Sequence, residues 1–506
     1  MILDGRPVEV PDDGASLLEA IRDRTGERSP KDGCSPQGQC GCCTVLVDGQ
    51  PRVACVTPVR RVANREVTTF HGLDPAVRDR LVAAFVDHGA SQCGFCTPGI
   101  VVRLAAEPTD VGTALLAHLC RCTGWRTILD AYERGPLGGE RDLIAAGRRA
   151  TLEGGSPQAV GPEVVGGDAG FAEDTAPSGA LVAVPSAAGG WAVAATLVQA
   201  RAKAGKVQGR RSTVDLTWPL DVPPGDWALT LRTTWVEPAY LEPDAAWCIP
   251  GGAPSSCLAN GGAFGGKASS PVGGVARALA DEHGVPVRAV LAREDVVRLG
   301  PKRPPIAAGV RADGTGVIRV AATPDIAFGP GFAVEHVTVA GPPTSAAIRG
   351  AGWVEAAVLR AGLRNEMPAV VTAPSGGWAA ATVSGEAIEV TVGAGEVLDA
   401  VVLRSYCIGA AHQALGWVTS EGIAVDEAGV PQDLTIRSFG ILRARDMPAV
   451  AVTIAPPGTP APGSDRDGPT DAVNASDAVF AAVAAATWIN EGRPPAWPTR
   501  PTRSSS

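Results

Sequence analysis

The sequence predicts an α+β fold divided among several domains, and three features support this prediction. Residues 1–10 alternate apolar and polar side chains, as a strand with one buried face does. Residues 76–88, 99–106 and 111–118 repeat their apolar side chains at helical spacing. Residues 387–405 alternate like strands joined by a turn. A chain of 506 residues is long enough for several cores, and its 62 Gly and 43 Pro predict many turns.

The composition excludes several classes of protein. Hydrophobic residues make up 45% and charged residues 19% of the chain, which is typical of a globular protein. The net charge of −9 leaves no basic face for phosphates, so we expect no nucleic-acid partner. No apolar run reaches membrane-spanning length, so we expect no membrane partner. The first ten residues resemble a strand rather than a signal peptide, which predicts a cytoplasmic, thiol-reducing setting.

Nine of the twelve cysteines lie before residue 123, and the first five of them form one group. That group reads GCSPQGQCGCCTVLVDGQPRVAC, and its glycines allow the backbone to wrap closely around an inorganic core. The spacing Cys34-x5-Cys40-x2-Cys43, followed by Cys55, is close to the plant-type ferredoxin spacing C-x4-C-x2-C…C. We therefore assign these four cysteines as ligands and leave Cys42 outside the set.

The second group contains Cys93-x2-Cys96 and Cys120-x-Cys122. Helical segments surround it, which predicts that these ligands lie at helix ends in a small bundle. Zinc is the alternative for either group, because C-x2-C pairs commonly bind zinc. The remaining cysteines are most simply buried small hydrophobic residues; they are Cys248, Cys257 and Cys407.

Residues 1–135 resemble the iron–sulfur part of the xanthine dehydrogenase/aldehyde oxidase family of molybdenum hydroxylases. The motifs that carry this resemblance are KDGC…CGCCTVLVDG, QCGFCTPGIVV and LCRCTGW. The resemblance implies a β-grasp [2Fe–2S] ferredoxin domain followed by a helical-bundle [2Fe–2S] domain. It also implies that Gln92 hydrogen-bonds a pterin and that Cys122 is the cluster ligand nearest to that pterin.

The rest of the chain resembles the molybdopterin-binding part of the same family more weakly. GGAFGGK (261–267) matches a cofactor-binding loop, although a tight turn would explain these glycines equally well. The resemblance implies that three segments contact the cofactor. They are this loop, the R-G-x-G motif at 349–352, whose Arg suits an anionic group, and a Gly-rich loop at 409–422. The residues implied are Gly261, Gly262, Phe264, Gly265, Gly266, Arg349, Gly352, Gly409 and Gly416. A surface Arg in a turn is the alternative for Arg349. Residues 474–488 resemble the helix that closes the molybdenum domain.

Three departures from the family pattern concern the molybdenum part. Residues 138–506 are abridged, because the family usually uses about twice this length. The family's catalytic base is a Glu in a G-x-G-E motif, where this chain has Gly468-Pro469-Thr470-Asp471. We take Asp471 as the candidate catalytic base, although Thr470 aligns about as well. Tyr406 falls where the family has a cofactor-contacting Gln, and an ordinary half-buried Tyr is the simpler interpretation.

These assignments divide the chain into six segments. The region after 365 is set apart by the alternating stretch 387–405, and residues 456–469 are expected to form an exposed loop. Residues 494–506 are expected to be disordered. The segments are a ferredoxin-like domain (1–72), a helical domain (73–137), a linker with a short helix (138–157), two molybdopterin-binding-like parts (158–365 and 366–495) and a tail (496–506).

The resemblance implies an oxidoreductase that oxidises a small-molecule substrate, an aldehyde or an N-heterocycle, with oxygen from water. Its cofactors would be two [2Fe–2S] clusters and molybdopterin with molybdenum. The sequence has no FAD-binding segment, so the electron acceptor would be a separate FAD-binding subunit or a soluble carrier, and a homodimer is compatible with this assignment. The alternative is a non-catalytic electron-transfer subunit with a degenerate molybdopterin region. A zinc- or disulfide-stabilised binding protein is a third interpretation.

Overall fold

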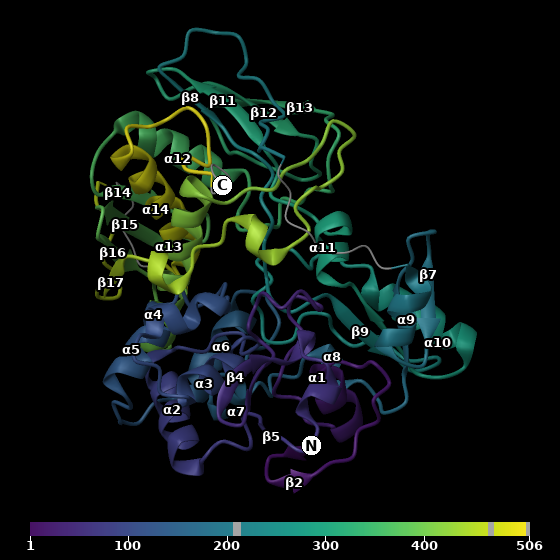
Figure 1. Ribbon diagram of the computed structural model, residues 1–506. Coiled ribbons are helices and arrows are strands. Elements are labelled where there is room, and N and C mark those ends of the chain that lie inside the picture. Colours follow the sequence, from purple (N-terminus) through teal and green to yellow (C-terminus); the bar gives the residue numbers. More distant parts are fainter. Residues whose placement is uncertain (206–213, 464–469, 502–506) are drawn as a thin grey trace.

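The computed structural model describes residues 1–205, 214–463 and 470–501. Four small sheets and the helices that cover them make up the fold, which confirms the predicted α+β class. In Figure 1 the N-terminal region lies at the bottom, and the sheets of the later regions lie above it and to its right. No helix among the described residues is long and apolar enough to cross a membrane.

The first sheet lies within the predicted ferredoxin-like segment and has the strand order β2-β1-β5-β3-β4. β1 and β5 run parallel, whereas β3 is antiparallel to both β4 and β5. A capping box in which Ser16 and Glu19 bond each other's backbone N–H groups begins the short helix beside this sheet. The elements are β1 (Ile2–Leu3), β2 (Arg6–Pro7), α1 (Leu17–Glu19), a π-helix (Ala20–Thr25), β3 (Thr44–Val47), β4 (Gln50–Val53), 3-10 helices (Ala54–Val56, Val59–Val62) and β5 (Glu66–Thr68).

Helices occupy the next segment, as the periodicity of 76–88, 99–106 and 111–118 predicts. The first begins where Asp74 accepts N–H bonds ahead of Pro75, and it ends at Gly89, whose φ is +63°. It packs against α3, α5 and α7. The elements are α2 (Pro75–His88), α3 (Thr97–Ala105), α4 (Val111–Ala114), a 3-10 helix (Leu115–Ala117), α5 (Arg126–Arg134), α6 (Leu143–Leu152), α7 (Pro162–Gly166) and α8 (Ala172–Thr175).

Two four-stranded sheets follow, with orders β7-β6-β10-β9 and β13-β12-β11-β8. Helices α9 and α10 pack on the first of them. The elements of the first are β6 (Leu181–Pro185), β7 (Trp191–Ala194), α9 (Leu197–Ala204), β9 (Ala245–Cys248), α10 (Val272–His283), β10 (Val287–Val290) and α11 (Arg293–Leu299). Those of the second are β8 (Leu229–Arg232), β11 (Ile306–Val310), β12 (Gly316–Ala321) and β13 (Phe332–Val337).

The last sheet has the order β14-β15-β16-β17, and α14 packs on it and against α12 and α13. Ala and Val dominate α14, and nearly all of its residues are buried, so the helix predicted over 474–488 forms the centre of this region. The elements are α12 (Trp353–Arg364), β14 (Ala369–Thr372), β15 (Trp378–Val383), β16 (Ala387–Gly393), α13 (Ala400–Thr419), 3-10 helices (Ile436–Phe439, Ala444–Asp446), β17 (Ala449–Ile454) and α14 (Ser476–Asn490).

Two expectations for residues 387–422 are wrong. Residues 387–405 contain only one strand, because Asp399 caps a helix that runs from Ala400 to Thr419. That helix includes Gly409 and Gly416, so the predicted Gly-rich loop is helical. Both glycines serve packing: a Cβ at Gly409 would lie 1.7 Å from the carbonyl oxygen of Cys122.

The segment predicted to be a disordered tail is ordered as far as residue 501. Trp497 is 1% exposed, and its ring makes edge contacts with Trp417 and Trp488 at centroid distances of 4.8 and 5.6 Å. The backbone N–H of Thr499 donates to Val418 at 2.8 Å. The free energy gained by burying the Trp497 ring orders this segment, although the prolines around it favour turns and exposed chain. Residues 502–506, and residues 464–469 of the predicted exposed loop, lie outside the described residues.

Candidate functional site

The four cysteines assigned to the first set are brought together in the structure. All four are buried, in the loop before β3 and in the 3-10 helix after β4. The side chain of Cys34 contacts those of Cys40 and Cys55, and Cys55 also contacts Cys43. The loop that carries Cys34, Cys40 and Cys43 and the 3-10 helix that carries Cys55 therefore present their thiols to one another, as the spacing predicts.

Backbone N–H groups point at the sulfurs of this set. Those of Gln37 and Gln39 lie 3.3 and 3.4 Å from Sγ of Cys34, and that of Cys55 lies 3.4 Å from Sγ of Cys43. The loop can do this because Gly38 has a φ of +69°, which turns the chain around the sulfur. N–H groups directed at thiolate sulfur stabilise negative charge there.

The second set consists of two pairs. The Sγ atoms of Cys93 and Cys122 lie 3.5 Å apart, and the side chains of Cys96 and Cys120 contact each other. Cys96 is the N-cap of α3, and Cys120 and Cys122 precede α5, so the predicted placement at helix ends is confirmed. Cys93 is half-buried, and the other three are buried.

Contacts between the thiols of the second set shift the pKa of three of them. The hydrogen bond from Cys96 lowers the pKa of Cys120 to about 7, while the same contact and burial raise the pKa of Cys96. The contact with Cys93, together with burial, raises the pKa of Cys122. Cysteines bind metal as thiolates, so metal binding at this set would displace the protons that these contacts retain.

A zinc site needs four ligands that converge on one ion, whereas a [2Fe–2S] cluster spreads its four thiolates over two irons, two on each. The second set forms two contacting pairs, Cys93 with Cys122 and Cys96 with Cys120, which is compatible with the cluster arrangement. All twelve cysteines are free thiols in the structure.

The GGAFGGK loop lies directly against the second set. A Cβ on Gly262 would be 3.0 Å from Cβ of Cys93 and 3.2 Å from Sγ of Cys122, and Gly262 has a φ of +85°. Gly261, with a φ of +84°, lies against the side-chain amide of Gln158 in the same way. Only glycine fits both positions, so this loop is more than an ordinary turn.

The second half of the loop packs on the segment that carries Arg349. A Cβ on Gly265 would be 1.9 Å from the carbonyl oxygen of Ala347, and one on Gly266 would be 2.5 Å from the Tyr240 ring. The backbone N–H of Arg349 donates to the carbonyl of Phe264 at 3.2 Å. Gly352 of the same segment, with a φ of +97°, is the N-cap of α12.

Arg349 is half-buried, and its Nε is closed off from solvent, so it differs from an ordinary surface Arg. Its guanidinium lies 5.2 Å from the ring centroids of both Phe264 and Phe480. Desolvation lowers its pKa to about 10, and Nε has no hydrogen-bond partner among the described residues. A half-buried guanidinium with an unpaired N–H favours an anionic ligand.

Arg349 and the rings of Phe264 and Phe480 line a cavity. The sequence predicted Phe264 and Arg349 as cofactor-binding residues but did not predict the other lining residues. The cavity wall also includes a buried ion pair in which Arg121 donates to both carboxylate oxygens of Glu421 at 2.5 and 2.6 Å. Arg121 stands between two cysteines of the second set, so this pair ties the cluster loop to the cavity. The lining residues are Arg121, Val236, Glu237, Pro238, Phe264, Arg303, Ile348, Arg349, Gln413, Trp417, Glu421 and Phe480.

The residues around this cavity fit the chemistry of an anionic, oxo-bearing cofactor such as molybdopterin with molybdenum. Two observations support the fit. The Nε of Arg349 has no hydrogen-bond partner among the described residues, and Gly261 and Gly262 leave backbone that a bound group can approach closely. The space open to water is only about 20 Å³, so side chains at the wall must move to admit a cofactor.

Two exposed carboxylates precede or begin α14, and neither is among the cavity-lining residues. Asp471, the predicted base, lies in the loop before α14. Asp477 lies in the first turn of the helix, one turn before Phe480, and its charge acts on both Arg349 and Arg303. The pattern G-x-G-E draws attention to position 471, and no sequence signal points to 477. The role of Asp471 stays a prediction.

Gln92 and Tyr406 lie beside the second set, where the resemblance predicts the cofactor. The side-chain amide of Gln92 donates to the carbonyl oxygens of Cys122 and Ser405 at 2.9 and 3.1 Å. The hydroxyl of Tyr406 donates to Oε1 of Gln158 at 2.7 Å. Tyr406 is half-buried, as the simpler interpretation expects, and it takes part in a polar cluster with Gln158 next to Gly261.

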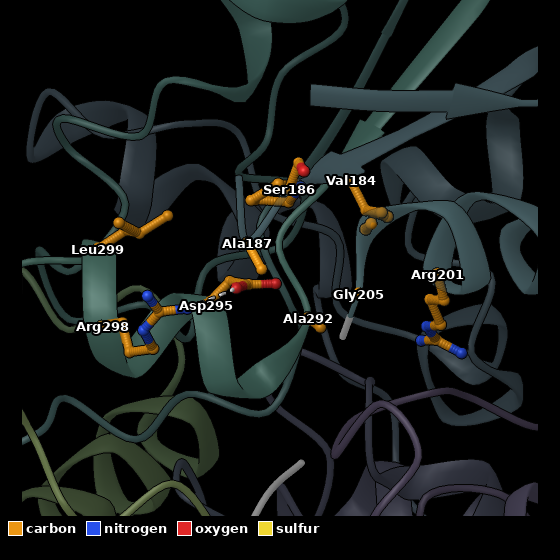
Figure 2. Close-up of a pocket in the computed structure, with 11 residues that line it drawn as sticks. Val184, Ser186, Ala187, Arg201, Gly205, Ala292, Asp295, Arg298 and Leu299 are labelled. Atoms are coloured by element: carbon orange, nitrogen blue, oxygen red, sulfur yellow. Dashed lines mark ion pairs between the residues drawn. The ribbon is translucent and has the colours of Figure 1, made fainter. Parts of the chain in front are cut away.

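A separate cavity of about 80 Å³ lies at the end of β6 (Figure 2). Its two cations are already paired: Arg201 contacts Asp32 at 3.2 Å, and Arg298 contacts Asp295 at 3.8 Å. Neither thiol set lines this cavity, so we place the candidate site at Arg349 instead.

Comparisons with known proteins agree with the thiol sets and the fold. A family model described as a [2Fe-2S] binding domain matches residues 69–133, which include the whole second set. Isoquinoline 1-oxidoreductase subunit alpha of Brevundimonas diminuta is 38% identical over 144 residues, which is 26% of this chain and 93% of that protein. Aldehyde oxidoreductase of Megalodesulfovibrio gigas is 40% identical over 129 residues, but this match spans only 14% of that protein and 23% of this chain.

A solved structure resembles the whole chain. Aldehyde oxidoreductase from Desulfovibrio desulfuricans superposes with a TM-score of 0.69 at 14% identity, covering 99% of each chain, which shows a shared fold. The sequence match over nearly all of the isoquinoline 1-oxidoreductase subunit shows the descent. This chain therefore belongs to the xanthine dehydrogenase/aldehyde oxidase family of molybdenum hydroxylases.

Proposed function

We propose that this chain oxidises an aldehyde or an N-heterocycle with oxygen from water and passes the electrons through two [2Fe–2S] clusters. One observation carries the proposal: a single loop touches both the second thiol set and the cavity. Gly262 contacts Cys93 and Cys122, and two residues later Phe264 lines the cavity with Arg349. Electrons released by a substrate in the cavity would thus pass first to the cluster bound by Cys93 and Cys122.

The oxidation balances as substrate C–H plus water giving C–OH, two protons and two electrons. Each [2Fe–2S] cluster takes one electron, so two clusters store one turnover. The Cys93/Cys96/Cys120/Cys122 set is next to the cavity and would be reduced first. The Cys34/Cys40/Cys43/Cys55 set would follow and deliver to a separate FAD-binding subunit or a soluble carrier in the cytoplasm. The relatives named as subunits support a partner chain.

A bound molybdenum centre would supply the oxygen-transfer and two-electron chemistry. Gln92 and Gly262 would hold the pterin end, because they lie against Cys122, and Gly261 precedes Gly262 in the same loop. Arg349 would neutralise an anionic group of the cofactor or substrate. The rings of Phe264 and Phe480 on either side of its guanidinium favour a flat substrate.

A base must remove the proton from water. Asp477 is exposed to solvent in the same first turns of α14 that carry Phe480, and its charge raises the pKa of Arg349, so its carboxylate would accept a proton and release it to bulk water. Asp471 is the alternative base, and it would need a rearranged loop to reach the same place. We propose Asp477 for this role.

A second function is favoured by the small free volume at Arg349. A chain whose cavity never opens would keep the clusters and act only as an electron-transfer subunit with a degenerate molybdopterin region. Purified protein mixed anaerobically with an aldehyde or an N-heterocycle in ¹⁸O-labelled water distinguishes the two. Substrate that bleaches the iron–sulfur absorption and gives labelled product supports the enzyme. Bleaching by dithionite but by none of the substrates contradicts it and leaves the electron carrier.

A further inference from the structure

A cavity of about 220 Å³ lies where the N-terminal region meets the sheet with the order β7-β6-β10-β9. Asp23 of the π-helix and Arg28 of the loop after it form one side. The other side consists of Arg288 of β10, Val182 of β6 and the segments 176–180 and 195–197. Neither thiol set lines this cavity, so it is separate from the candidate site.

The two arginines of this cavity lack close acceptors. Nη1 of Arg28 is closed off from solvent and has no hydrogen-bond partner among the described residues, and its ion pair with Asp23 is 3.6 Å long. Arg288 is only 8% exposed, yet its Nη1 lies 3.5 Å from the carbonyl oxygen of Glu173 and 3.6 Å from the carboxylate of the same residue. A guanidinium that is well paired with a carboxylate approaches it to about 2.7–2.9 Å. Both guanidiniums can therefore accept a better partner.

Positive charge gathers around this cavity. Burial lowers the pKa of Arg28, and the charges of Arg22 and Arg288 act on that pKa in the same direction. Arg22 and Lys31 share one carboxylate, that of Asp174, at 2.7 and 2.6 Å. Like charges repel one another at close range, and an anion placed between them replaces that repulsion with attraction. The cavity therefore suits an anionic ligand.

We propose that this cavity binds one phosphoryl group between Arg28 and Arg288. A phosphoryl group is a tetrahedral oxyanion, so it has enough oxygens to accept hydrogen bonds from two guanidiniums at once. A carboxylate has only two oxygens, and those of Asp23 and Glu173 stay 3.6 Å from the arginines. The volume is below the range of about 300–1,000 Å³ that cofactor sites occupy, so the bound group is small. This inference needs neither the clusters nor molybdenum.

The test measures the binding of radiolabelled inorganic phosphate to the purified full-length protein by equilibrium dialysis at constant ionic strength. Arg28→Gln and Arg288→Gln each remove one guanidinium of the cavity. Two controls remove a guanidinium elsewhere: Arg319→Gln in an exposed ion pair on β12, and Arg349→Gln at the candidate cofactor cavity. Circular dichroism reports whether each variant folds.

We expect one phosphate per chain in the wild type. Loss of the charge-assisted hydrogen bonds from one arginine should raise the dissociation constant about ten- to hundredfold in Arg28→Gln and in Arg288→Gln. Both controls should bind phosphate as the wild type does. Because Arg28 is half-buried and Arg288 is buried, Arg28→Gln decides the test alone if Arg288→Gln fails to fold.

Three outcomes overturn the proposal. They are no saturable binding by the wild type, unchanged binding by Arg28→Gln, and binding that is lost in Arg349→Gln but kept in Arg28→Gln, which assigns the phosphate to the cofactor cavity. Acetate that displaces phosphate at an equal concentration identifies a carboxylate site and also overturns it.

Ribose 5-phosphate distinguishes the two sources of a phosphoryl group. Displacement of phosphate by this ester supports the end of a phosphate monoester as the ligand. Phosphate binding that the ester does not disturb supports free inorganic phosphate.

Discussion

The ion pair between Arg121 and Glu421 joins the loop of the second thiol set to the end of α13. Both side chains are nearly fully buried, at 6% and 2% exposure, and two hydrogen bonds join them. Glu421→Gln keeps the shape but leaves the Arg121 charge buried without its partner. Removing one member of such a pair costs about 3–5 kcal/mol.

Glu335→Gln is a matched control, because it makes the same change in an exposed pair. Glu335 contacts Arg319 at 2.7 Å with side chains 49% and 27% exposed, and such pairs contribute about 0–1 kcal/mol. Denaturant unfolding of the iron-loaded proteins measures both costs, and the EPR signal of the second cluster reports whether its ligand loop has moved. Equal stabilities for the two variants, with an unaltered signal, would refute this account of the cluster loop.

Three further predictions concern α13 and α14. Gly409→Ala should lower the free energy of unfolding by about 1–3 kcal/mol and lose iron from the second set, because its Cβ meets the backbone of the cluster loop. Gly274→Ala is the control, because Gly274 lies in open space on α10, and it should raise the free energy of unfolding by up to about 1 kcal/mol in the same assay. Burial lowers the pKa of His412 to about 4, so the unfolded chain binds more protons than the folded chain below about pH 6.5. His412 should therefore lower the free energy of unfolding by about 2 kcal/mol between pH 7.5 and pH 5. His412→Gln should flatten that pH profile, and an unchanged slope would count against this account. Asp477→Asn should lower kcat by at least about 10²-fold, while Asp471→Asn stays within a few-fold; the reverse ranking would restore Asp471 as the base.

The cysteine sets are the part of the site that the sequence predicts best. Ligand spacing is a local property, so the separation of Cys34, Cys40, Cys43 and Cys55 already requires a tight loop, and the structure forms it. The helices around the second set were predictable for the same reason, because periodicity and Asp74-Pro75 capping act within a few residues.

The errors arise where tertiary packing decides the local structure. Gly409 and Gly416 suggest a loop by composition, yet they lie in a helix because neighbouring backbone approaches too closely for a side chain. Trp497 sits among prolines that suggest disorder, and its burial against two other tryptophans orders them. Asp477 has no sequence motif, and only the turn of α14 that carries Phe480 brings it toward Arg349.

The metal and pterin content of the purified chain tests the central claim most directly. The account predicts about four iron atoms and one molybdenum per chain, with a pterin released on denaturation. Four irons with neither molybdenum nor pterin would contradict the oxidoreductase and leave an electron carrier. Zinc in place of iron would contradict the clusters as well.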